Sequence, residues 1–261
     1  MFSINPFATL SSSVAPIVMQ SYVVIMVLLV ALGTVYDTIH RGSAKYFFSN
    51  WRKAKKSSSR TLGGGEMVGH AVKTAVANVA LSSEFCNQKR RIAHLLGMWG
   101  FTIYALATAV MVFQYPTPTS PTPAIIPQLW WLGAAMVCVG GYWFWFFIRV
   151  DVLAEGGSPF RLMRADMFVV LLMTSCTVAL IWAYLQGIES AWANVSLGLY
   201  LILTTVLFGS VPWTKFAHMF FKPAAALQKR VAIADGSRSN LPEPADKPAT
   251  LGDPRRHPSN Y

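Results

Sequence analysis

Five long apolar runs set the strongest constraint on how this chain can fold. They span residues 16–36, 94–113, 129–148, 167–186 and 192–213, and none of them contains Lys, Arg, Asp or Glu. A helix of about 20 residues, rising ~1.5 Å per residue, crosses a hydrocarbon core of ~30 Å. The runs therefore predict an all-α integral membrane protein with five transmembrane helices.

The basic residues give this topology an orientation. If the segments between the runs alternate sides, residues 41–93, 149–166 and 214–261 share one side and hold all 22 Lys and Arg residues. The positive-inside rule makes that side cytoplasmic, so residues 1–15 are predicted to be external and the C-terminus cytoplasmic. The net charge of +11 is then explained by helix orientation and anionic headgroups rather than by nucleic acid. A docking face for an acidic cytoplasmic partner is the alternative.

The chain is expected to form one membrane domain, residues 16–233, followed by a disordered cytoplasmic tail, residues 234–261. The tail is rich in Pro, Ser and charge. Between the first two apolar runs, residues 66–86 space Val and Ala at helical intervals, which predicts an amphipathic helix on the cytoplasmic surface. Residues 53–65 are turn-rich and expected to be flexible.

Two histidines lie at matching depth in this topology. His94 opens the second run and His218 follows the fifth, so both fall at the predicted cytoplasmic end. Axial ligation of a b-type haem requires one imidazole on each face of the iron, which two helices can supply at equal depth. The alternative is that both are ordinary interfacial histidines with solvated rings.

Neighbouring residues suit the rest of such a site. Gly97 and Gly100 would clear room on the His94 helix. Candidates for contact with the haem propionates are Arg90, Arg91, Lys215, Arg149, Arg161 and Arg164. Pro212 should kink or end the fifth helix, although the apolar residues around His218 favour a helix that continues past it.

The sequences around both histidines resemble the nitrate reductase gamma-subunit superfamily of five-helix b-type cytochromes. This group includes membrane subunits of heterodisulfide reductase and of quinone-interacting oxidoreductase complexes. The run from Arg91 to Phe101 is similar to the family's opening of a helix with His, an apolar stretch and Gly-Phe. The run from Pro212 to His218 is similar to its Pro-aromatic-Ser/Thr-Lys-Phe-x-His ending of the last helix. The likeness covers about residues 20–230.

The chain departs from the two-haem members of that superfamily. Their two further histidines fall here on Tyr104 and Tyr200. Tyrosine can ligate haem, but two tyrosines inside apolar runs are expected to be packing residues with hydrogen-bonded hydroxyls. The resemblance therefore implies one b-type haem, held by His94 and His218 on the cytoplasmic side.

The resemblance also implies a function. It indicates an electron-transfer subunit of the bacterial inner membrane, without a catalytic site of its own, that links a cytoplasmic iron–sulfur or flavin enzyme to the quinone pool. The chain is most like the short members that accompany adenylylsulfate reductase in sulfur-oxidising bacteria. Asp37 and His40, at i and i+3 where the first run ends, are candidates for a quinone contact. A solvated helix end is the alternative for that pair.

Two other functions compete with electron transfer. One is a haem-free membrane anchor that docks a cytoplasmic enzyme through residues 41–93 and the tail. The other is a small-solute transporter, against which the lack of ionisable residues inside the apolar runs argues.

Overall fold

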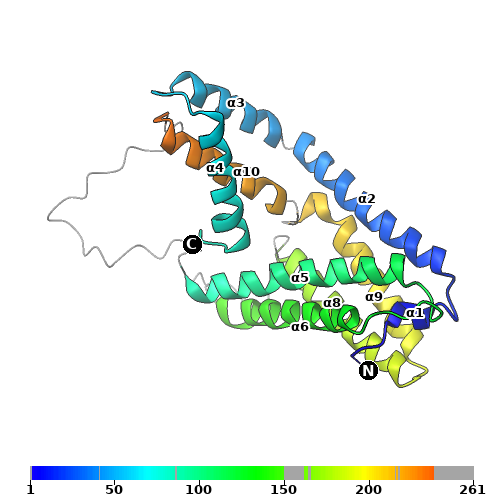
Figure 1. The fold of residues 1–261 in the computed structure, drawn as a ribbon. Helices are drawn as coiled ribbons and strands as arrows, with labels where there is room; N and C mark the ends of the chain where they lie inside the picture. The colour runs from blue at the N-terminus through cyan, green and yellow to red at the C-terminus, as the bar shows by residue number, and fades with distance from the viewer. Residues whose placement is uncertain are drawn as a thin grey trace.

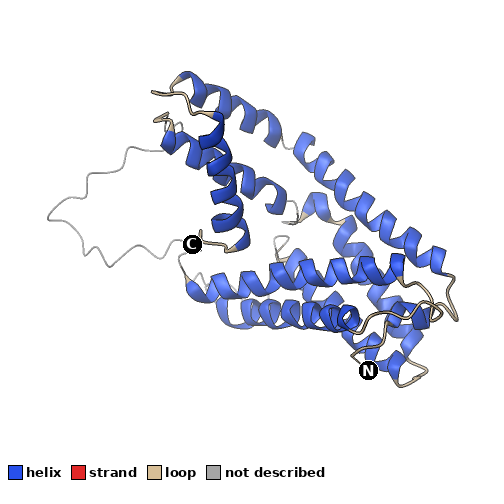
Figure 2. Ribbon diagram, in the orientation of Figure 1, coloured by secondary structure: helices blue, strands red, loops and turns tan. Residues whose placement is uncertain are grey.

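The computed structural model describes residues 2–40, 42–85, 87–149, 162–163, 166–214, 216 and 218–237. Every regular element in these ranges is a helix, which confirms the predicted all-α class (Figure 2). The elements are α1 (Pro6–Leu10), α2 (Pro16–His40), α3 (Ser43–Lys56), α4 (Gly64–Lys73), the π-helix η1 (Thr74–Ala80), α5 (Gln88–Gln114), α6 (Ile125–Trp143), the π-helix η2 (Phe144–Ile148), α8 (Met167–Gly187), α9 (Ala193–Gly209), the 3-10 helix η3 (Val211–Trp213) and α10 (His218–Ala234).

Within the described ranges, four helices are long and apolar enough to cross a membrane. They are α2, α5, α6 together with η2, and α8. The fifth predicted span is shorter than expected, because α9 has 17 residues and the turn that follows contains Pro212. Seventeen residues of helix extend about 26 Å, slightly less than a ~30 Å hydrocarbon core. The chain is thus a multi-pass membrane protein.

Glycines bring α5 and α6 into close contact in the bundle, where Figure 1 shows the two helices side by side. A Cβ atom on Gly133 would lie 2.7 Å from the carbonyl oxygen of Gly100, and one on Gly140 would lie 2.7 Å from that of Ala93. Small residues allow such close approach between membrane helices, where packing drives association. Gly100 therefore makes room for α6, whereas a Cβ added to Gly97 would meet nothing within 4 Å.

The predicted external segment folds onto one end of the bundle. The Asn5 side chain accepts the backbone N–H groups of Phe7 and Ala8 at the start of α1 and donates to the Tyr115 carbonyl oxygen at 2.9 Å. Phe7 is buried, and its ring lies edge-on to Trp182 with centroids 5.2 Å apart. Residues 5–10 are therefore part of the hydrophobic core rather than a free extension.

The helix predicted within residues 66–86 is confirmed, with α4 and η1 together covering Gly64–Ala80. It packs against α10, where Arg230 donates to the Asn78 side-chain oxygen at 2.6 Å. Figure 1 shows α4 and α10 together near the end of the bundle where α5 begins. Three segments far apart in sequence thus meet at this end.

Residues 59 and 60, in the stretch predicted to be flexible, form hydrogen bonds with residues 234 and 235, at the predicted start of the tail. The Asp235 carbonyl oxygen accepts the backbone N–H of Ser59 at 3.0 Å and that of Arg60 at 3.3 Å. The Arg60 side chain donates to the Ala234 carbonyl oxygen at 2.8 Å. The predicted start of the tail at residue 234 coincides with the end of α10, and these bonds involve residues 234 and 235. Residues 238–261 lie outside the described ranges.

Substitution of a contact glycine should weaken the bundle. Gly133→Ala is expected to cost about 1–3 kcal/mol of stability, because its methyl group would press on the backbone of α5. Gly198→Ala, in the apolar helix α9, is the matched control, since a Cβ there meets nothing within 4 Å. Thermal unfolding of both variants in detergent measures the difference. Equal unfolding temperatures would contradict the close contact between α5 and α6.

Candidate haem site

His94 is positioned by the start of α5. The helix begins after Asn87, whose side-chain oxygen accepts the N–H groups of Lys89 at 2.9 Å and Arg90 at 3.3 Å. His94 follows two turns later and is half-buried. Its ring lies 4.9 Å from that of Phe85, measured between centroids. The cap therefore fixes how far His94 stands from the end of the helix.

His218 is the first residue of α10 rather than part of a continued fifth helix. The expectation that Pro212 ends or kinks the fifth helix is confirmed, and the alternative of a helix that continues past it is not observed, because α9 ends at Gly209 and η3 turns the chain. The chain changes direction between the end of α9 and the start of α10. His218 therefore belongs to a helix whose direction is independent of α9.

Phe216 holds the turn between α9 and α10 against the bundle. It is 2% exposed, and its ring centroid lies 6.4 Å from Phe101 on α5 and 5.2 Å from Phe168 on α8. The Phe168 ring also lies edge-on to His218 at 6.2 Å. One aromatic cluster thus anchors the segment that carries His218 to the helix that carries His94.

The two predicted axial ligands adjoin the same aromatic cluster. The Phe168 ring lies 6.2 Å from that of His218, and Phe216 links Phe168 to Phe101, which stands two turns beyond His94 on α5. Gly97 lies one turn beyond His94 on the same face of α5, and a Cβ added to it would meet nothing within 4 Å. Two imidazoles, aromatic rings and open space over a glycine suit a flat, apolar macrocycle with iron at its centre. The residues present therefore fit a haem.

Two of the arginines predicted to bind the haem propionates already interact with other groups of the protein. Arg91 donates through Nε to the Leu81 carbonyl oxygen at 2.8 Å. Arg149 is buried, stacks over the Trp145 ring at 3.9 Å and forms an ion pair with Asp166. Arg90 is half-buried and lies one turn before His94 on α5. Three further candidates, Lys215, Arg161 and Arg164, lie outside the described residues.

The predicted quinone pair does not share one environment. Asp37 is 6% exposed, whereas His40 is exposed and stacks on Tyr36 with ring centroids 5.4 Å apart. Asp37 lies one turn beyond Gly33 on the same side of α2, and Gly33 faces Val211 of η3. Of the two residues, Asp37 is therefore the one directed toward the turn that leads to His218.

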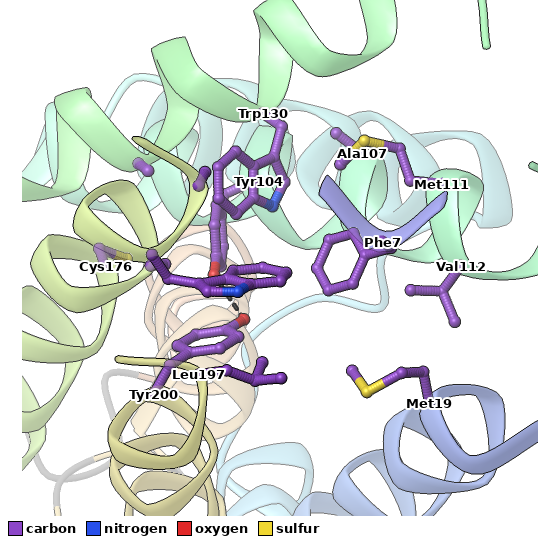
Figure 3. Close-up of a cluster of buried hydrophobic side chains, with 14 of the residues drawn as sticks. Phe7, Met19, Tyr104, Ala107, Met111, Val112, Trp130, Cys176, Leu197 and Tyr200 are labelled. Atoms are coloured by element: carbon purple, nitrogen blue, oxygen red, sulfur yellow. Dashed lines mark hydrogen bonds between the residues drawn. The ribbon is translucent and has the colours of Figure 1, made fainter. Parts of the chain in front are cut away.

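Tyr104 and Tyr200 form a buried hydrogen-bonded pair with 2.6 Å between their hydroxyl oxygens (Figure 3). Tyr200 stacks on Trp182 with centroids 5.9 Å apart, and Tyr104 lies 5.3 Å from Trp130. The predicted packing role with a hydrogen-bonded hydroxyl is confirmed. Both tyrosines belong to the main hydrophobic core.

Sequence reasoning missed Ser82, whose Oγ lies 3.0 Å from His94 Nδ1. It also missed Phe168, which touches both His218 and Phe216. Ser82 and Ser83 mark a turn before α5, but the pattern does not indicate which of them reaches the histidine. Phe168 is one of many apolar residues in the run 167–186, and the sequence gives no signal that distinguishes it.

Comparisons with known proteins give one distant similarity. No protein-family model matches the chain, and no solved structure matches it. Citrate utilization protein B of Escherichia coli is 24% identical over 159 residues, which are 58% of this chain and 40% of that protein. The chain thus matches less than half the length of this relative, and the similarity does not assign it to a family.

The tyrosine pair should contribute stability without affecting a haem. Tyr104→Phe and Tyr200→Phe are each expected to cost about 0.5–2 kcal/mol, because each leaves a buried hydroxyl without its partner. The double variant should lose less than the sum of the two. Tyr184→Phe, on the exposed side of α8, is the control. Loss of haem from either single variant would contradict the packing role.

Proposed function

We propose that this protein is a membrane-anchored electron-transfer subunit that holds one b-type haem between His94 and His218. The observation that carries the proposal is that one aromatic cluster, Phe101, Phe168 and Phe216, joins the start of α10, where His218 stands, to α5, which carries His94. On α5, a Cβ added to Gly97 would meet nothing within 4 Å. A bound haem would supply reversible one-electron transfer between ferric and ferrous iron. No other residue of the site needs to react.

The surrounding residues bind and shield the cofactor in this proposal. His94 and His218 supply the axial nitrogens, and Gly97 leaves room for the edge of the macrocycle. The rings of Phe101, Phe168 and Phe216 exclude water from this side of the site. Exclusion of water tunes the reduction potential of a bound haem. Arg90 is retained as a candidate for a propionate contact.

The proposed partners lie on both sides of the site. A cytoplasmic iron–sulfur or flavin enzyme, with adenylylsulfate reductase as the candidate, would exchange electrons with the haem, and a quinone in the bilayer would complete the path. Asp37 is the proposed quinone contact, because it is buried on the face of α2 that meets η3. A haem on the cytoplasmic side means that the quinone exchanges protons there. The five-helix b-type cytochromes that the sequence resembles supply the precedent.

Haem content tests the proposal directly. The full-length protein purified in detergent should give the pyridine haemochrome spectrum of haem b, with one haem per chain. His94→Ala and His218→Ala should each lose it, because one imidazole cannot hold the iron from both faces. His257→Ala is the control and should retain it. A folded wild-type protein without haem, in cells supplied with haem precursor, would contradict the function and favour the haem-free anchor.

The proposed topology has the N-terminus outside and the C-terminus in the cytoplasm, with α9 and η3 completing a fifth span in the inner membrane. Five spans place the termini on opposite sides, whereas four place them on the same side. A fluorescent-protein fusion after residue 261 should fluoresce, and a cysteine introduced at Ser3 should react with an impermeant thiol reagent in intact spheroplasts. Both termini on one side would contradict the fifth span.

A further inference from the structure

Ser82 adopts an unusual backbone conformation at the base of the site. Its φ angle is +48°, and its side chain is 2% exposed. Among the described non-glycine residues only Ser82 and Glu189 have positive φ angles. Such a conformation is disfavoured for residues with a Cβ atom and persists where surrounding contacts impose it. The contacts around Ser82 therefore show what holds it in this conformation.

Those contacts tie the turn to the helix that carries His94. Three side chains of α5 bond to three consecutive residues: Trp99 Nε1 donates to Ala80 O at 3.0 Å, Arg91 Nε donates to Leu81 O at 2.8 Å, and His94 Nδ1 lies 3.0 Å from Ser82 Oγ. The first two bonds fix the backbone of the two residues that precede the serine. The hydroxyl is thereby held against one nitrogen of the imidazole.

The surroundings also indicate the direction of the hydrogen bond. Ser82 Oγ lies 3.5 Å from the Val79 carbonyl oxygen, which can only accept a proton. With its own proton directed to Val79, the hydroxyl accepts the N–H of His94 Nδ1. The lone pair of the imidazole is then on Nε2, the nitrogen on the opposite side of the ring.

We infer that Ser82 is a positioning residue for the haem, holding the His94 ring so that Nε2 is the nitrogen directed to the iron. The inference rests on the proposed function. Outer hydrogen bonds of this kind fix the orientation of a ligating histidine and raise its basicity. In this proposal, the positive φ angle of Ser82 serves to direct its hydroxyl toward His94 Nδ1.

The test compares Ser82 variants of the full-length protein that carries haem. Ser82→Ala removes the acceptor, and haem affinity should fall by about tenfold. The midpoint potential, measured by redox titration of the visible spectrum, should move to a more positive value, because a less basic imidazole stabilises ferric iron less. Ser83→Ala, at the exposed neighbouring position, is the matched control and should change neither quantity.

Two further variants separate the hydroxyl from the backbone. Ser82→Asn retains an acceptor and tolerates positive φ, so it should return the potential toward the wild-type value. Ser82→Gly relaxes the backbone without an acceptor and should behave like Ser82→Ala. A wild-type potential and affinity in Ser82→Ala and Ser82→Gly would overturn the inference and leave the haem site standing. A wild-type protein without haem would overturn the proposed function and the inference together.

Discussion

The close contact between α5 and α6 is the constraint on which the rest of the structure depends. Lipid tails are as apolar as the helix surfaces, so the two helices associate through packing rather than through exclusion from water. Gly100, Gly133 and Gly140 allow backbone atoms to come where a Cβ would overlap them. This contact fixes α5 in the bundle, and Asn87 fixes where α5 begins. The position of His94 follows from both.

The second half of the site depends on a break rather than on a continuous helix. Pro212 and the 3-10 turn end the fifth apolar run, and Phe216 then holds the chain against α5 and α8. A helix continued from α9 would carry His218 about 9 Å along the α9 axis after Pro212. The break lets α10 start beside Phe168 and pack against η1, where Arg230 contacts Asn78.

The sequence predicts the elements whose signals are local. Apolar length identifies four spans, and helical spacing of Val and Ala identifies α4 and η1. His94 and His218 are proposed as ligands because the order of the apolar runs predicts that both lie at the same depth in the membrane. Long-range contacts leave no such signal. The roles of Gly100 and Ser82, and the pairing of Arg149 with Asp166, depend on which helices touch.

In the proposed function, two imidazoles, one from α5 and one from α10, ligate one iron. Electron paramagnetic resonance of the oxidised wild-type protein, combined with near-infrared magnetic circular dichroism, identifies the axial ligands of a ferric haem directly. We expect a single low-spin haem with two histidine ligands. A high-spin haem, or a low-spin haem with one histidine and a different second ligand, would contradict it.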